Sequence, residues 1–154
     1  MAARRAEEYI ETIYDVVQRK GYAKVTDVSR ILNVGLSAVT EMFQKLGNEG
    51  YVNYEKYSGV TLTKKGEEIA IELTKKHKVL RDFFVILGLD EKIADDDACN
   101  IEHVVKPETM KRLTKFVDFI QSREEPLWLE RFKTYYETGE LPECPRTIKK
   151  GKRC

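Results

Sequence analysis

Three side chains that can bind a divalent cation share one face of a predicted helix at residues 91–105. Cys99, Glu102 and His103 stand at positions i, i+3 and i+4, a spacing that brings side chains together on consecutive helical turns. A thiolate sulfur, a carboxylate oxygen and an imidazole nitrogen together suit a first-row divalent metal ion. The spacing therefore predicts a metal site. The alternative interpretation is a small buried thiol beside a solvated glutamate.

Two further polar features can add ligands to such a site. Glu8, Glu11 and Asp15 form a stripe on the first predicted helix, well away from its apolar face, and taken alone this stripe is typical of a solvated surface. His77, the only other histidine, lies at the edge of the apolar stripe of a predicted long helix, where an edge-of-core histidine is the alternative. An enzyme is not indicated, because the chain contains no Gly-rich phosphate loop, HExxH or Gly-x-Ser-x-Gly motif.

The elements that must position these residues follow from hydrophobic periodicity. Apolar residues repeat at helical spacing in three short N-terminal segments, and Thr26 is expected to cap the second. A change to β-branched and aromatic residues predicts a hairpin over 51–62, and Thr63 is expected to cap a long helix from Lys64 to about Leu87. Helices at about 91–105, 107–122 and 126–138 follow. The expected inward side chains are Ile10, Ile13, Tyr14, Val17, Val28, Ile31, Leu32, Val39, Met42, Phe43, Leu46, Ile69, Leu73, Leu80, Phe84 and Leu87.

Three helices followed by a hairpin are the element order of a winged helix-turn-helix. The third helix, at about 37–46, can lie in the major groove of DNA, and the hairpin would be the wing beside the backbone. A helix-turn-helix can also serve as a protein–protein module, and residues 1–75 carry no net charge, so this alternative stays open. The expected DNA-contacting residues are Ser37, Ala38, Thr40, Gln44, Lys45 and Lys56.

The fold class expected is mostly α, with an N-terminal winged helix-turn-helix followed by a helical dimerisation domain. The boundaries are residues 1–71 for the DNA-binding domain, 72–140 for the metal-binding and dimerisation domain, and 141–154 for a flexible basic tail. The helix at 64–87 links the two domains. Aromatic and aliphatic side chains over 107–138 exceed what one small helical layer can hide, which predicts a two-fold interface. Cys144 and Cys154 lie in the tail and are expected to have no ligand role.

Composition is consistent with an intracellular globular protein. The 154 residues are 42% hydrophobic and 34% charged, with a net charge of +1. This balance argues against indiscriminate polyanion binding but allows a local DNA site. No window approaches the ~18 consecutive apolar residues of a membrane helix, and the start lacks the apolar segment of a signal peptide. A cytoplasmic location with no membrane partner is therefore expected.

Several motifs in order resemble one family of regulators. They are Glu8-Tyr9-Ile10-Glu11-Thr12-Ile13-Tyr14, Lys20-Gly21-Tyr22-Ala23-Lys24-Val25, the helix at 37–46, Tyr54-Glu55-Lys56-Tyr57, Leu62-Thr63-x-x-Gly66 and Ile101-Glu102-His103. Over about residues 6–135 the chain resembles the metal-dependent repressors of the diphtheria-toxin-repressor class, specifically the short manganese transport regulator branch.

The resemblance implies a homodimeric, metal-activated repressor that binds double-stranded operator DNA and controls manganese or iron homeostasis. Its metal ligands fall on Glu8, Glu11, His77, Cys99, Glu102 and His103. The cofactor implied is Mn²⁺ or Fe²⁺, with up to two ions per subunit, because Glu11 and Glu102 fall where that branch bridges two ions. A metal-independent winged-helix adaptor that binds other proteins is the alternative function.

Two ligand positions depart from the manganese branch. Position 8 there usually holds Asp, and position 99 usually holds Glu, whereas this chain has Glu8 and Cys99. The iron-sensing branch places a cysteine at the second position but pairs it with a methionine on the first helix. A thiolate favours Fe²⁺ and Zn²⁺ over Mn²⁺. The hybrid ligand set predicts that Fe²⁺ is at least as effective as Mn²⁺.

Overall fold

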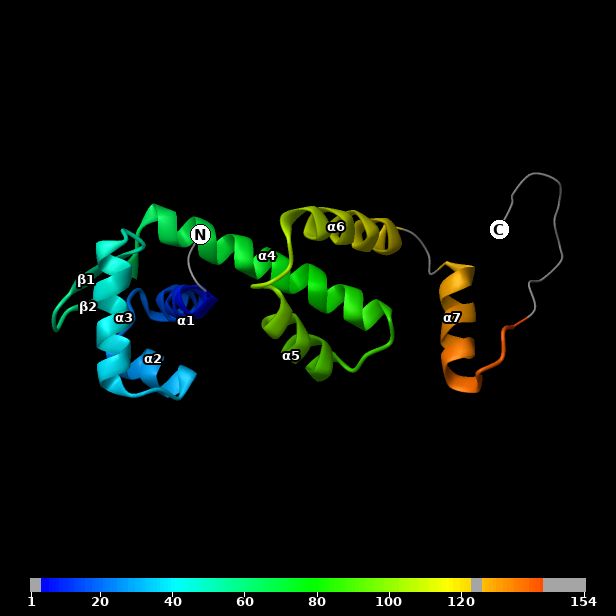
Figure 1. Ribbon diagram of the computed structural model, residues 1–154, viewed down its shortest axis with the longest axis horizontal. Helices are drawn as coiled ribbons and strands as arrows, with labels where there is room; N and C mark the ends of the chain where they lie inside the picture. Colours follow the sequence, from blue (N-terminus) through cyan, green and yellow to red (C-terminus); the bar gives the residue numbers. More distant parts are fainter. Residues whose placement is uncertain (1–3, 123–125, 143–154) are drawn as a thin grey trace.

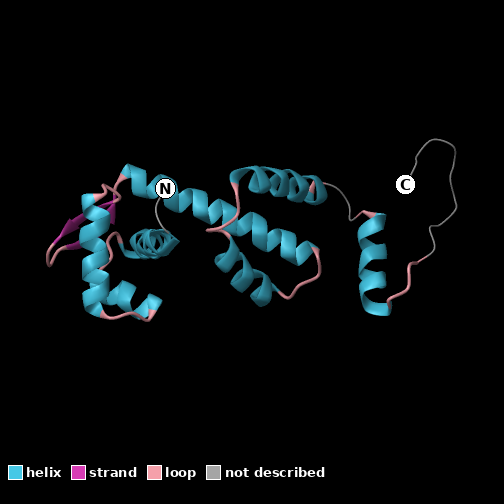
Figure 2. Ribbon diagram, in the orientation of Figure 1, coloured by secondary structure: helices cyan, strands magenta, loops and turns pink. Residues whose placement is uncertain are grey.

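The computed structural model describes residues 4–122 and 126–142, as an elongated and mostly helical molecule (Figures 1 and 2). A small hairpin lies at one end and the last helix at the other (Figure 1). Most of the expected basic tail, including Cys144 and Cys154, lies outside the described residues. Among the helices described, none combines the length and apolarity needed to cross a membrane.

The N-terminal half is a winged helix-turn-helix, which confirms the predicted fold class. Its helices are α1 (Arg4–Lys20), α2 (Val25–Leu32) and α3 (Leu36–Asn48), and its wing pairs β1 (Val52–Glu55) with β2 (Gly59–Leu62) in antiparallel register. A bridge between Ala23 and Val60 fastens the wing to the segment before α2. Gly59 is required at this contact, because its φ is +98° and a Cβ there would lie 2.9 Å from the Ala23 carbonyl oxygen.

The core of this half follows the predicted apolar stripes. Ile10, Ile13, Val39, Phe43 and Leu46 are fully buried, while Tyr14, Val17 and Met42 pack against them at the edge. Ile31, by contrast, is exposed: on α2 Val28 is buried, and Val25 and Leu32 pack against the core at its edge.

The start of α2 differs from the prediction. Thr26 is not its cap: the helix begins at Val25, and the Asp27 carboxylate accepts the backbone N–H of Lys24 at 2.8 Å. An acid three residues into a helix can reach back to the residue that precedes it, so Asp27 satisfies the backbone N–H of Lys24 at the start of this helix.

Helix α4 (Lys64–Ile86) runs from the wing into the second half of the molecule (Figure 1). Thr63 caps it as predicted, since its hydroxyl oxygen accepts the Gly66 N–H at 3.2 Å. Leu73 and Leu80 are buried as expected. Leu87 is not an inward residue: it is 36% exposed, because the helix ends at Ile86 and the chain reverses at Gly88.

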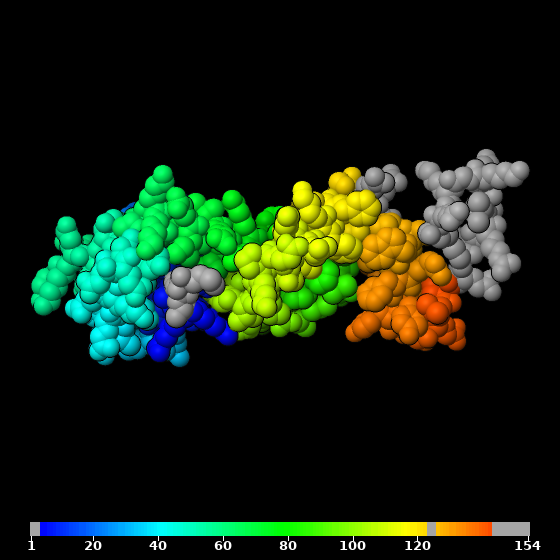
Figure 3. All heavy atoms as spheres, turned by 45° about the horizontal axis from the view of Figure 1, so that its top comes forward, coloured from blue at the N-terminus to red at the C-terminus, as the bar shows by residue number. Residues whose placement is uncertain are grey.

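Two helices pack on the distal half of α4, and a third extends beyond them. α5 (Glu91–Ile101) and α6 (Pro107–Gln121) enclose a small apolar cluster of Leu80, Ala98 and Met110. α5 is shorter than the predicted 91–105, so Glu102 caps its C-terminus and His103 follows it in a turn. α7 (Leu127–Thr138) lies at the far end (Figure 3), and the centre of its Trp128 ring is 6.3 Å from that of the Phe116 ring.

Candidate metal centre and DNA interface

Ligand-type side chains gather where the start of α1 meets the end of α5. One potential ligand atom each from Glu11, Glu102 and His103 lies within 4.8 Å of the other two. These three residues come from both halves of the chain, and α4 passes beside them (Figure 1). The structure thus brings together half of the ligand set that the family resemblance implied.

Glu102 is the most unusual residue of this cluster. It is 1% exposed, and its Oε2 lies 2.9 Å from Nδ1 of His77. Burial, followed by the neighbouring carboxylate of Glu11 and a hydrogen bond with it, raises the pKa of Glu102 to about 9. Glu102 therefore keeps a proton at neutral pH unless a positive charge takes its place.

His103 is the second buried polar residue of this cluster. Its side chain is 1% exposed, its Nδ1 lies 2.9 Å from Oε2 of Glu7, and its Nε2 lies 3.4 Å from Oε1 of Glu102. Within the part of the chain that the structure describes, neither Nε2 of His103 nor Oε1 of Glu102 has a hydrogen-bond partner. Buried polar atoms without partners are costly, and a carboxylate facing an imidazole nitrogen fits a divalent cation.

His77 borders the cluster. Its ring lies between two carboxylates, with Nδ1 2.9 Å from Glu102 and Nε2 2.9 Å from Asp95. The ring is only partly exposed, and both of its nitrogens have acidic neighbours. It is therefore bound into the polar cluster rather than packed at the edge of the apolar core.

Glu8 and Cys99 lie outside the three-residue group. Glu8 is partly exposed and forms an ion pair with Arg4 at 3.2 Å. Cys99 is an exposed free cysteine, and partial burial of its thiol, followed by the negative charges of Glu102 and Glu11, raises its pKa. The Glu8 carboxylate also acts on the Cys99 thiol, but neither residue belongs to the group whose ligand atoms lie within 4.8 Å of one another.

Two carboxylates of the site were not predicted from the sequence. Glu7 contacts His103, and Asp95 contacts His77. Glu7 stands four residues before Glu11 and Asp95 four before Cys99, so helical spacing offered a signal for both.

The predicted DNA-contacting residues line the outer face of α3 and the wing. Ser37, Gln44, Lys45 and Lys56 are exposed. Ala38 and Thr40 are partly buried, and the Thr40 hydroxyl donates to the Leu36 carbonyl at 2.9 Å. A surface groove of about 350 Å³ separates the start of α3 from the wing, with Lys24, Thr40, Lys56 and Tyr57 among its lining residues.

Comparison with known proteins assigns both halves of the chain. Residues 1–60 match the N-terminal DNA-binding domain of iron-dependent repressors, and residues 63–125 match the metal-binding and dimerisation domain of the same proteins. The chain belongs to the iron-dependent repressor family. The family assignment excludes a metal-independent adaptor and an enzyme: this is a metal-dependent, DNA-binding transcriptional repressor of the manganese and iron type.

Individual relatives agree with this family assignment. The chain is 41% identical over 119 residues to the HTH-type transcriptional regulator MntR of Bacillus pumilus, covering 77% of this chain and 83% of that protein. It is 45% identical over 114 residues to an uncharacterised HTH-type transcriptional regulator of Methanocaldococcus jannaschii, covering 73% and 91%. A manganese-dependent transcriptional repressor solved in complex with manganese superposes with a TM-score of 0.67 at 26% identity. That match covers 74% of this chain and 53% of the other, so this chain spans about half the length of that repressor.

Proposed function

We propose that this repressor is a cytoplasmic homodimer switched on by Mn²⁺ or Fe²⁺ at the junction of α1 and α5. The observation that carries the proposal is the pair of buried atoms, Oε1 of Glu102 and Nε2 of His103, that face each other at 3.4 Å beside Glu11. A bound dication would supply the positive charge that lets Glu102 ionise and remain buried.

The full ligand set that we propose extends from this cluster to its neighbours. Glu11, Glu102 and His103 form its centre, and His77 joins through its contact with Glu102. Glu8, which pairs with Arg4, and the exposed Cys99 would have to turn inward when a metal binds. Glu11 and Glu102 lie at the centre of this set and would contribute to holding both ions if each subunit binds two.

The switch that we propose is a population shift. Glu8 and Glu11 belong to α1 in the DNA-binding half, whereas the other ligands belong to α4, α5 and the turn after α5. Ligands drawn together across this junction restrict the orientation of α3, and with it the spacing of the two recognition helices in a dimer. In this proposal residues 1–71 bind DNA, residues 72–140 bind metal and dimerise, and residues 141–154 form a flexible tail.

On the DNA side, we propose that Ser37, Ala38, Thr40 and Gln44 approach the base edges of the operator. Lys45 and Lys56 are then the phosphate contacts. The exposed positions of these two lysines on α3 and the wing support this assignment.

Metal choice depends on Cys99 in this proposal. Its thiol must lose a proton to bind, and its raised pKa makes that step depend on a nearby dication. One sulfur among harder ligands improves binding of Fe²⁺ more than of Mn²⁺, so Fe²⁺ is expected to be at least as effective. Zn²⁺ is expected to bind tightly but to activate poorly, because its tetrahedral preference leaves some ligands unused.

The test is anaerobic operator binding titrated with Mn²⁺, Fe²⁺ and Zn²⁺, for the wild-type protein and for Cys99→Glu. The expected result is metal-dependent binding in both proteins, with the variant shifted toward Mn²⁺. Asp15→Asn, an exposed acid on α1, is the matched control and should behave as the wild type. Operator binding that a chelator leaves unchanged would contradict the switch, and an identical metal ranking in both proteins would contradict the role of Cys99.

A further inference from the structure

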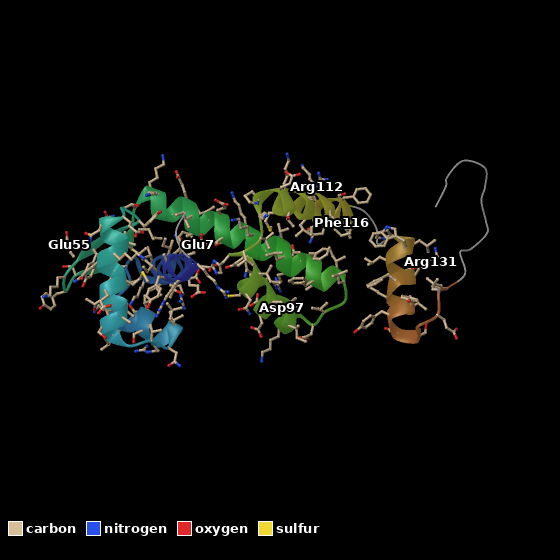
Figure 4. All side chains as sticks on the ribbon, in the orientation of Figure 1. Glu7, Glu55, Asp97, Arg112, Phe116 and Arg131 are labelled. Carbon is tan, nitrogen blue, oxygen red and sulfur yellow. The ribbon has the colours of Figure 1, made fainter. Side chains whose placement is uncertain are left out.

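The ring of His103 is held by a carboxylate that the proposed ligand set does not contain. Oε2 of Glu7 lies 2.9 Å from Nδ1 of His103, and the two residues are 96 positions apart in the chain. Glu7 is itself only partly exposed, and it lies at the end of α1 nearest α5 (Figure 4). The contact is therefore part of the enclosed junction rather than of the surface.

This contact selects one arrangement of the ring proton. Where the Glu7 carboxylate is ionised it can only accept a hydrogen bond, and the donor across this contact is then the Nδ1–H of His103. A neutral imidazole has one protonated nitrogen, which leaves Nε2 with a free lone pair. Nε2 is the atom that faces Oε1 of Glu102 and that is buried without a partner among the described residues.

We propose that Glu7 is a positioning residue, which fixes the tautomer and ring orientation of His103 so that the Nε2 lone pair points at Glu11 and Glu102. The proposal rests on the metal site described above. A histidine that binds a metal through one nitrogen commonly donates its other N–H to a carboxylate, and loss of that partner costs about 10- to 100-fold in metal affinity. Glu7 meets that description by position and distance, without being a ligand itself.

The contact also crosses between the two halves of the molecule. Glu7 belongs to α1, which is part of the DNA-binding half, whereas His103 follows α5 in the metal-binding half. If α1 moves so that Glu7 leaves this contact, the His103 ring is no longer held in place. His103, which belongs to the metal-binding half, is then a weaker metal ligand. Because coupling between two binding sites is reciprocal, the arrangement that holds Glu7 in place then favours both metal and operator.

The first test measures the ring directly, in the full-length metal-free protein. Long-range ¹H–¹⁵N NMR of the imidazoles at pH 8 is expected to show His103 with its proton on Nδ1 in the wild type. Glu7→Ala is expected to give a mixture of tautomers, and Glu7→Gln, which keeps an acceptor oxygen, to restore the wild-type form. A wild-type ring with its proton on Nε2 or on both nitrogens, or an unchanged tautomer in Glu7→Ala, would overturn the proposal.

The second test measures the Kd of Mn²⁺ by competition with a fluorescent chelator, without DNA. Glu7→Ala is expected to raise the Kd about 10- to 100-fold and Glu7→Gln to raise it less, whereas Asp15→Asn should leave it unchanged. Glu102→Gln reports separately on the metal site. Loss of tight binding in Glu102→Gln together with a wild-type Kd in Glu7→Ala would overturn the role of Glu7 alone. A wild-type Kd in Glu102→Gln would overturn the proposed site as well.

Discussion

The two halves of the molecule are stabilised in different ways. The DNA-binding half has a continuous apolar core that includes the fully buried Ile10, Ile13 and Phe43. The second half has a small cluster of Leu80, Ala98 and Met110, buries the carboxyl group of Glu102 beside it, and leaves Leu127 and Trp128 about half exposed. The first half is therefore held together mainly by apolar packing. The second half matches a metal-binding and dimerisation domain, and under the function proposed above a cation inside it and a second copy outside it would complete its contacts.

Among substitutions that test this difference between the halves, Phe43→Ala is expected to have the largest effect on stability. Phe43 is fully buried and its ring stacks edge-on against Tyr54 at 5.5 Å, so removing it leaves a cavity and lowers the free energy of unfolding by about 3–5 kcal/mol. Urea denaturation measures this loss, which should be similar with and without Mn²⁺. The control is Leu36→Ala on the same helix, where a 54% exposed side chain should cost within about 0.5 kcal/mol. Equal losses in the two variants would contradict the assignment of the core.

The metal-binding half is expected to respond to pH in the metal-free protein. Glu102 has a pKa of about 9 in the folded state and about 4.5 in the unfolded chain, so between these values the folded state binds more protons. The free energy of unfolding should then fall as the pH rises from about 4.5 to about 9. Chemical denaturation across this range measures the slope, and Glu102→Gln should reduce it.

The pH dependence of metal binding tests the protonation of Glu102 in a second way. Because Glu102 must lose its proton to bind a cation, the affinity for Mn²⁺ should rise with pH over the same interval. Two outcomes would show that Glu102 is already ionised in the metal-free protein. One is a slope of the free energy of unfolding against pH that is the same in the wild type and in Glu102→Gln, and the other is an affinity for Mn²⁺ that does not change with pH.

A smaller effect is expected from Leu127→Ser on α7. Leu127 is 53% exposed, and covering the rest of its surface is worth roughly 1 kcal/mol in each subunit, so with two copies in a dimer the Kd should rise roughly 30-fold. Light scattering over a dilution series measures this change. Tyr57→Ser, at the exposed wing, is the control and should leave the dimer intact. A wild-type protein that is monomeric at micromolar concentration with metal present would contradict a dimer interface on α7.

The smallest effect is expected from Lys45→Ala. Loss of one phosphate contact should weaken binding to all DNA sequences and lower the slope of log K against log salt by about one unit. Gln44→Ala should instead weaken binding to some sequences only, because Gln44 is assigned to base edges. Fluorescence anisotropy at several salt concentrations distinguishes the two, and a sequence-dependent loss in Lys45→Ala would contradict its phosphate assignment.

The order and type of the elements could be predicted from the sequence because apolar periodicity determined them. The stripe of Val39, Phe43 and Leu46 places α3, and the change of period after Gly50 places the wing. Element ends were less predictable, since α5 stops at Ile101 where Glu102 turns inward, an outcome of tertiary packing that local spacing does not encode.

The candidate site was predicted only in part. Helical spacing indicated Glu102 and His103 together with Cys99, whereas Glu11 was expected only from the family resemblance; the structure brings Glu11, Glu102 and His103 together. Glu7 was missed because helical spacing shows only that it shares a face with Glu11. Its contact with His103 depends on how α1 meets α5, which spacing does not show. Asp95 was missed for the same reason, within a run of three aspartates that indicates only a charged surface.

Helix α4 limits how the DNA-binding half can move. Its 23 residues form one rod of about 35 Å, and the Thr63 hydroxyl at its start donates to the Gly50 carbonyl beside the wing. The wing and α3 are therefore fixed to one end of this rod, while α5 and α6 are fixed to the other. Helix α1 also packs against this rod and reaches the turn after α5 through the contact of Glu7 with His103. A metal ion held jointly by α1 and the end of α5 would therefore join the two halves at a second point, away from the rod.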